Sequence, residues 1–205
     1  MATHKQDPLP TVPMGRREAG KAAKRARILD AAERRLRTQG YDQMTMAEVA
    51  NDADVAIGTV FSYAATKAEL LMMVTAQRWS GSVPKALAEH ANEDPALAIR
   101  ALLQPIADTA KLEPQTCAAI ARELLFGTDG PHQREVVDLV AELETAIVAI
   151  IEQDGPSPRA PAAARLVVSG GLMEVNRGRT GRATMDDLEA RLTDMITIVL
   201  SGTGF

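Results

Sequence analysis

Residues 53–70, ADVAIGTVFSYAATKAEL, gather a glycine, several hydroxyl groups, two aromatic rings and a lysine within a short distance. Phe61 and Tyr63 are two of only six aromatic residues in the chain of 205 residues. Hydroxyl and ammonium groups are good partners for phosphate oxygens, and apolar side chains can contact the methyl group of thymine. The stretch therefore predicts a short helix that enters the major groove of double-stranded DNA.

The base-facing side of this helix is expected to carry Ile57, Phe61 and Ser62. Gly58 has no side chain, so the backbone can approach the DNA closely there. The alternative is that Gly58 is an ordinary glycine at the helix entry. Thr59 offers a hydroxyl group to a phosphate and a methyl group to thymine.

Phosphate contacts are expected from three further side chains. Thr45 begins the preceding helix, where the backbone amides point outward. Tyr63 and Lys67 follow the base-facing residues, although Lys67 is alternatively a solvated surface lysine. The predicted DNA-binding residues are Thr45, Ile57, Gly58, Thr59, Phe61, Ser62, Tyr63 and Lys67.

Charge is distributed unevenly along the chain. Residues 16–37 carry nine Lys and Arg against three acidic residues, whereas the whole chain has a net charge of −4. A basic block on an acidic body indicates a localised contact with a polyanion, and the alternative is a solvated helix face. The sequence does not decide whether the basic arm contacts DNA. The basic residues concerned are Arg16, Arg17, Lys21, Lys24 and Arg25.

Several short sequence signals predict the helices that present these residues. Apolar spacing predicts a helix over about 17–38, which Gly40 ends. Thr45 and Glu48 form a capping-box pattern for a short second helix, and a third helix is expected over 56–62. Two short helices joined by a tight turn and packed on a longer helix describe a helix-turn-helix unit.

The remaining sequence also predicts helices and no strand. Thr66 begins a fourth helix, and further helices are expected over 96–111, 115–126, 132–153, 162–176 and 185–200. Aromatic residues make up only 3% of the chain, so the core is expected to consist of aliphatic side chains. The predicted fold class is all-α, with about nine or ten helices.

Residues 28–70 resemble the N-terminal domain of TetR-family transcriptional regulators. The resemblance rests on Ile28, Ala31, Ala32, Gly40, Thr45, Val49, Ala50, Ala53, Val55, Gly58, Thr59, Tyr63, Lys67 and Leu70. It implies an N-terminal three-helix helix-turn-helix DNA-binding domain and a C-terminal helical ligand-binding and dimerisation domain. The sequence departs from the family pattern at Asp54, Ala56, Phe61 and Ala64, where Gly, a capping hydroxyl, Tyr and another aromatic are usual.

The expected organisation is a disordered arm over 1–15, the helix-turn-helix domain over 16–66 and the ligand-binding and dimerisation domain over 67–205. A homodimer through the last two helices would read the two half-sites of a palindromic operator. Small residues in 162–176 and an apolar stripe in 185–200 favour that interface. The alternative is that the stripe packs only inside the monomer.

The resemblance also implies a small-molecule inducer of unknown identity, bound among the middle helices and releasing a repressor from DNA. The candidate ligand-binding residues are Trp79, Leu102, Ile106, Ile120, Arg122, Phe126 and Met173. Each apolar member is alternatively simple core. Arg122 either orients a polar head group or lies on a solvent-facing side of its helix.

Other functions are less well supported by the residues. The three histidines are scattered, and the sequence has no hydrolase, metalloprotease or Walker motif, so we expect no enzyme, no cofactor and no metal site. The absence of a signal peptide or apolar span predicts a cytoplasmic protein. Cys117 is either a buried structural cysteine or a redox sensor. Three alternatives stay open: an architectural DNA-binding protein without inducer, a helical partner-binding module, and an activator instead of a repressor.

Overall fold

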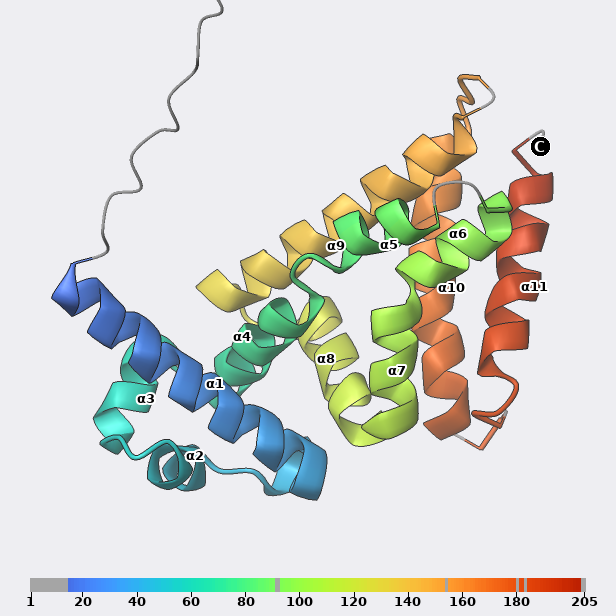
Figure 1. Cartoon of the computed structure of the whole chain (residues 1–205). Coiled ribbons are helices and arrows are strands. Elements are labelled where there is room, and N and C mark those ends of the chain that lie inside the picture. The colour runs from blue at the N-terminus through green and yellow to red at the C-terminus, as the bar shows by residue number, and fades with distance from the viewer. Residues whose placement is uncertain (1–14, 91–92, 154, 180, 183, 204–205) are drawn as a thin grey trace, which may run out of the picture.

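The computed structural model describes residues 15–90, 93–153, 155–179, 181–182 and 184–203, and these residues form helices and no strand (Figure 1). This confirms the all-α fold class. The predicted disordered arm over 1–15 lies outside the described residues, apart from Gly15. None of the helices in the described part of the chain combines the length and apolar character that a membrane crossing requires.

The N-terminal helices are α1 (Arg16–Gln43), α2 (Met46–Asp52) and α3 (Ile57–Tyr63). Helix α1 is interrupted at Gly40, whose φ of 77° and ψ of 169° are not helical. A side chain at this position would also collide with Gln115, since an added Cβ would lie 2.8 Å from its Oε1 atom. The predicted end of the regular helix at Gly40 is therefore confirmed.

Hydroxyl caps fix the starts of α2 and of α4 (Lys67–Trp79). The Thr45 hydroxyl accepts a hydrogen bond from the Glu48 amide, and the Glu48 carboxylate accepts one from the Thr45 amide. The Thr66 hydroxyl accepts from the amide of Glu69 in the same way. Both caps satisfy amides that have no partner inside their helices, as the sequence predicted.

The helix-turn-helix shares a continuous apolar core with the helices behind it. Ile28, Leu36 and Val60 are buried together with Leu70 and Met73 of α4. The same cluster extends to Ile120 and Val136 further along the chain. Tight packing of this kind transmits displacements, because a core at crystal-like density does not absorb them.

The C-terminal helices are α5 (Ser82–Glu89), α6 (Pro95–Leu102), α7 (Gln104–Leu112), α8 (Pro114–Phe126), α9 (Pro131–Ile151), α10 (Ala160–Arg179) and α11 (Leu188–Ser201). The single helix predicted over 96–111 is wrong, because α6 ends at Leu102 and α7 begins at Gln104. Pro105 has no N–H for the carbonyl of Ala101, so the helix cannot continue through this point. Helix α5 was not predicted, although Pro84 lies in its first turn, where no amide partner is needed.

Helices α10 and α11 pack on each other and on the rest of the body through a second core (Figure 1). Leu188, Leu192 and Ile196 of the predicted apolar stripe are all buried inside the chain. Gly170 faces Met195 so closely that an added Cβ would lie 2.4 Å from its sulfur. The large apolar side chains that α10 and α11 expose are different ones, namely Leu166, Met173 and Ile198.

Candidate DNA-binding surface and ligand site

Helix α3 presents the predicted base-facing residues on one open surface. Ile57 and Phe61 are each 46% exposed, and Gly58 and Ser62 are exposed beside them. Thr59 is half-buried, whereas Val60 is completely buried in the core cluster that also holds residues of α1, α2 and α4. A short helix with one fixed apolar anchor and an open outer face has the geometry of a helix that docks in a groove.

Three of the residues that depart from the family pattern, Asp54, Ala56 and Ala64, flank α3. Asp54 adopts a φ of 51°, in the left-handed region that Asp enters more readily than most residues. Ala56 precedes α3 without a side-chain capping bond. Ala64 is 1% exposed and fills a small space in the core. The turn before α3 is instead held by backbone hydrogen bonds, including that from the Val55 amide to the Ala50 carbonyl at 3.0 Å.

The polar groups predicted to bind phosphate already have partners within the chain. The Thr45 hydroxyl lies 2.8 Å from Glu48 Oε2, and the Tyr63 hydroxyl donates to the Lys21 carbonyl at 2.9 Å. Lys67 Nζ donates to the Asp42 carbonyl at 3.0 Å. The same ammonium group lies 4.5 Å from the centre of the Tyr41 ring. These contacts orient the side chains, and the ammonium group keeps further N–H donors for a phosphate.

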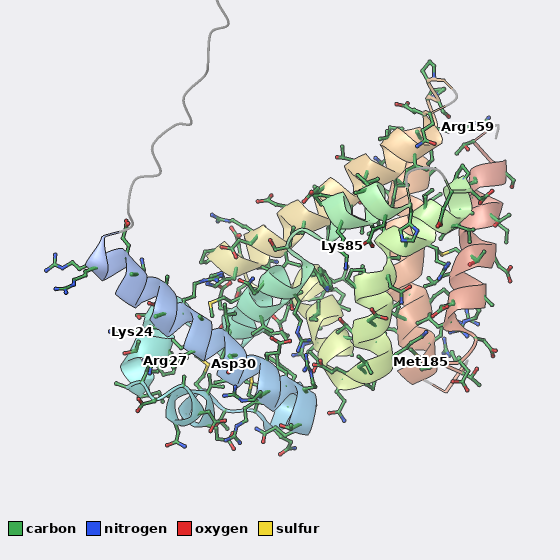
Figure 2. All side chains as sticks on the ribbon, in the orientation of Figure 1. Lys24, Arg27, Asp30, Lys85, Arg159 and Met185 are labelled. Atoms are coloured by element: carbon green, nitrogen blue, oxygen red, sulfur yellow. The ribbon has the colours of Figure 1, made fainter. Side chains whose placement is uncertain are left out.

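The basic residues of α1 lie beside α3. The Tyr63–Lys21 hydrogen bond joins the two helices, and Figure 2 shows Lys24 and Arg27 on the part of α1 that passes over α3. Arg16, Arg17, Lys21 and Lys24 are exposed, whereas Arg25 is half-buried and donates to Gln77. The described part of the basic block therefore extends the positive charge next to the recognition surface.

An ion-pair cluster ties α1 to α2. Arg35 donates from Nε and Nη2 to the two carboxylate oxygens of Asp52, at 2.6 and 2.8 Å, and from Nη1 to Glu48 at 3.1 Å. The Arg35 hydrogen bond lowers the pKa of Asp52. The Thr45 hydroxyl is the main cause that lowers the pKa of Glu48. Both carboxyl groups are thus held in their charged form at the start and end of α2.

His132 connects the body directly to the end of α3, and no sequence pattern had singled it out for this role. Its Nε2 atom lies 2.9 Å from the Tyr63 carbonyl oxygen, and its Nδ1 atom lies 3.1 Å from Glu135 Oε2. Its backbone amide donates to Glu69 Oε2 at 3.2 Å. The first turn of α9 therefore contacts both the last residue of α3 and the first turn of α4.

A hollow with a volume of about 560 Å³ lies between α1, α4, α5 and α7. Most of its lining is polar or charged. The charged side chains around it are Glu33, Arg37, Arg78, Lys85, Glu89, Arg100, Asp108 and Glu113. A separate apolar cleft of about 20 Å³ lies next to it, lined by Trp79, Val83, Leu102, Ile106, Leu139 and Leu143 among others.

The structure brings together three of the predicted ligand residues and separates the others. Trp79, Leu102 and Ile106 line the apolar cleft. Ile120 is buried in the core shared with the helix-turn-helix. Phe126 and Met173 are 82% and 66% exposed, and Arg122 is exposed with its guanidinium 3.1 Å from Glu123. Neither the hollow nor the cleft includes these three exposed residues. Arg122 and Phe126 lie near the C-terminal end of α8 and face solvent, and Met173 lies on the outer side of α10.

Cys117 lies in the second core, and burial raises the pKa of its thiol to about 11. A thiol with such a pKa is almost entirely protonated at neutral pH and reacts slowly, because the thiolate is the reactive form. Among the described residues, no group of His, Cys, Asp and Glu side chains is arranged to hold a metal ion.

Comparisons with known proteins agree with the class that this geometry indicates, a helix-turn-helix DNA-binding regulator. Residues 28–73 match the model of the tetR family of bacterial regulatory proteins. The HTH-type transcriptional repressor KstR of Mycolicibacterium smegmatis is 29% identical over 182 residues, which are 88% of each chain. KstR of Rhodococcus jostii is 24% identical over 177 residues, covering 86% of this chain and 82% of that protein.

Solved structures show the same fold. A TetR transcriptional regulator from Rhodococcus sp. RHA1 superposes with a TM-score of 0.69 at 19% identity, over 88% of this chain and 97% of that one. FadR of Thermus thermophilus in complex with lauroyl-CoA has a TM-score of 0.66 at 23% identity, over 87% of this chain and 94% of that one. The family model, the two KstR relatives and the shared fold together support a TetR-family transcriptional regulator. Its relatives are regulators and not enzymes, which confirms that expectation.

Proposed function

We propose that this regulator is a repressor that binds a palindromic operator as a homodimer and leaves it when a small, largely apolar ligand binds. In this proposal residues 16–66 form the DNA-binding domain and 67–205 the ligand-binding and dimerisation domain. The two KstR relatives are named as transcriptional repressors, which supports the repressor mode over the activator mode.

The observation that carries the proposal is the open outer face of α3. Ile57 and Phe61 are each 46% exposed there, and the exposed Gly58 leaves the backbone accessible between them. In the groove, Ile57 and Phe61 would contact thymine methyl groups, Ser62 a base edge, and Thr59 a phosphate. Thr45, Tyr63 and Lys67 would position the unit on the backbone.

Homodimerisation is proposed through α10 and α11, on the face that carries Leu166, Met173 and Ile198. Leu166 and Met173 are separated by about two helical turns, so they lie on the same side of α10. Three large exposed apolar side chains on adjacent helices are a suitable centre for an interface. Two helices from each protomer would form a four-helix bundle and set the distance between the two α3 helices.

The ligand is proposed to enter the apolar cleft at Trp79, Leu102 and Ile106. The cleft volume of about 20 Å³ is far below that of a typical ligand site, so binding requires α4 to move relative to α6, α7 and α9. Helix α4 also packs on α1 and carries Lys67, so this movement reaches the DNA-binding helices. The complexes of the fold neighbours with lauroyl-CoA and stearoyl-CoA make acyl-CoA thioesters the first ligand class to test.

Selection from a pool of random duplexes at a fixed salt concentration tests the DNA-binding part of this proposal. The proposal predicts enrichment of a palindrome whose half-sites are about one helical turn apart, because the two α3 helices of a dimer face one side of the duplex. Enrichment of no sequence would favour an architectural or partner-binding protein instead. Addition of lauroyl-CoA to the enriched complex then tests ligand-induced release.

A further inference from the structure

We propose that the charged hollow between α1, α4, α5 and α7 binds the anionic head group of an amphipathic ligand, and that Arg78 passes its occupancy to α1. The head group is a carboxylate or a phosphate, and the apolar part of the ligand enters the neighbouring cleft. This inference rests on the proposed function, because it names the ligand chemistry and the signalling contact of the same domain.

The first observation is that the polar hollow and the apolar cleft meet at one place. Trp79, Ser82 and Pro105 line both of them. The hollow, at about 560 Å³, lies within the usual size range of ligand sites, whereas the cleft is apolar and narrow. A ligand with a charged end and an aliphatic end matches this division of surfaces, and a purely apolar ligand would leave the hollow unused.

The second observation is an unsatisfied donor at the junction. Trp79 is only 8% exposed, and its indole Nε1 atom is buried without a hydrogen-bond partner among the described residues. A buried N–H group normally has an acceptor, and the indole N–H of Trp79 can only donate. An oxygen atom at the head of the ligand would supply the missing acceptor.

The third observation concerns the cations of the hollow. Lys85, labelled in Figure 2, is exposed on α5, lines the hollow and has no ion pair with any described residue. The Arg78 Nε and Nη2 atoms lie 3.4 Å from Glu33 and 3.0 Å from Glu113, yet neither nitrogen makes an aligned hydrogen bond. The two carboxylates therefore hold the guanidinium group by charge and not by directed hydrogen bonds. An anion that makes two hydrogen bonds to the guanidinium group could compete with them.

The hollow also contains carboxylates, so an anion must replace one of them on Arg78 and cannot simply be added. Glu113 is the suitable one to give way, because it is the residue that precedes the first turn of α8. The Glu113 side chain is buried and needs a counter-cation when Arg78 leaves it, and Arg37, 3.9 Å away, remains to supply one. Exchange of Glu113 for the ligand on Arg78 is thus the expected event.

This exchange would change the contact between α4 and α1, because Arg78 also pairs with Glu33. Arg78 lies in the last turn of α4 and contacts Glu33 on α1 as well as Glu113 at the start of α8. Arg37 on α1 also faces Glu113, at 3.9 Å. The cluster of Glu33, Arg37, Arg78 and Glu113 joins three helices, so a ligand that takes Arg78 loosens α1 from the body.

The test uses three probes with the same twelve-carbon chain: laurate, lauroyl-CoA and dodecanol, each added to the full-length protein below its micelle concentration. Trp79 is the only tryptophan in the chain, so its fluorescence reports the junction directly, and isothermal titration measures binding independently. At least one of the two anions should bind roughly tenfold or more tightly than dodecanol, as expected for a charge-assisted contact. The tighter anion distinguishes a carboxylate from a phosphate-bearing head group.

Two variants and a control assign the effect to the hollow. Lys85→Ala should weaken the preferred anion by roughly fivefold and leave dodecanol unchanged, and Glu113→Gln should strengthen the anion, since the competing charge is removed. Arg159→Ala, an exposed arginine at the start of α10 and far from the hollow (Figure 2), should change neither. The inference would be overturned if Lys85→Ala and Glu113→Gln both kept the wild-type ratio of anion affinity to dodecanol affinity. It would also be overturned if none of the three probes bound.

The DNA readout separates this inference from the proposed function. Ligand-induced release from the operator with no effect of Lys85→Ala or Glu113→Gln would leave the repressor proposal standing and reject the head-group site. Head-group-dependent binding without any change in operator affinity would support the site but reject both the relay through Arg78 and ligand-released repression. If the anion releases the wild-type protein from the operator, and each bound anion releases Glu113→Gln less effectively, both the head-group site and ligand-released repression are supported.

Discussion

The imidazole of His132, in the first turn of α9, lies with Nε2 2.9 Å from the backbone carbonyl oxygen of Tyr63, the last residue of α3. This carbonyl is one of the groups that a helix leaves without an internal partner at its C-terminus. The first turn of α9 thus supplies a bond that the end of α3 lacks. In the proposed function, a displacement of α9 relative to α4 would act on the orientation of α3 through this contact.

Replacement of His132 by Ala should weaken this link. The loss of the partly buried hydrogen bond to Tyr63, together with the exposed contact to Glu135, is expected to lower the free energy of unfolding by about 1 kcal/mol and to reduce the effect of ligand on operator affinity. Urea unfolding and DNA-binding titrations with and without ligand measure the two effects. Arg159→Ala, just before α10 and away from both α3 and the hollow (Figure 2), serves as the control for operator affinity without ligand. Equal ligand effects in His132→Ala and the wild type would show that the contact carries no coupling.

Acid should destabilise the helix-turn-helix through Arg35 and Asp52. The pKa of Asp52 is lowered in the folded protein, so its contribution is present above the pKa of the unfolded chain and is lost as pH falls through the folded pKa. Arg35→Met should therefore lower the melting temperature at neutral pH and flatten its decline toward acid. Arg27→Met, which removes the exposed pair with Asp54, should leave the shape of the curve unchanged. A parallel decline in Arg35→Met and wild type would argue against the ion pair.

Cys117 should be inert in the folded protein. Because its pKa is about 11, an aromatic disulfide reagent at neutral pH should react with it at the rate of unfolding and not at the rate of an exposed thiol. Absorbance traces with and without urea compare the two conditions. Rapid labelling of the native protein would revive the redox-sensor hypothesis.

A charge on the outer face of α10 should disrupt the proposed dimer. Leu166→Glu places a carboxylate at a side chain that is 61% exposed, so the monomer should tolerate it, whereas the homodimer should dissociate. Sedimentation or light scattering at micromolar concentration measures the mass. Leu125→Glu changes an equally exposed leucine on α8 and should leave the mass of the dimer unaltered. A dimer that persists in Leu166→Glu would place the interface elsewhere.

Local signals in the sequence predicted the helix-turn-helix because they act over a few residues. The Thr45–Glu48 capping box, the Thr66 cap and the break at Gly40 each depend on neighbours within one helical turn. The division of 96–111 at Pro105 was also local, but the helical pattern on either side obscured it.

Contacts between distant segments were not predictable in this way. Glu33, Arg78 and Glu113 meet because three helices converge, and nothing in their own neighbourhoods marks them as partners. For the same reason Phe126 was grouped with Trp79 as a ligand residue, although the end of α8 turns it to solvent. The apolar pattern of α11 likewise could not tell whether it faces its own chain or a second copy.

Contact between the outer face of α3 and operator bases is the central claim, and it is tested most directly by paired affinities of Phe61→Ala and Lys67→Ala. Both variants are titrated at fixed salt with the selected palindrome and with a scrambled duplex of equal length. Phe61→Ala should lose roughly tenfold on the palindrome alone, a cost on the order of 1–2 kcal/mol for one base contact, while Lys67→Ala should weaken both duplexes alike. Equal losses on both duplexes in Phe61→Ala, or no loss at all, would contradict base recognition by α3.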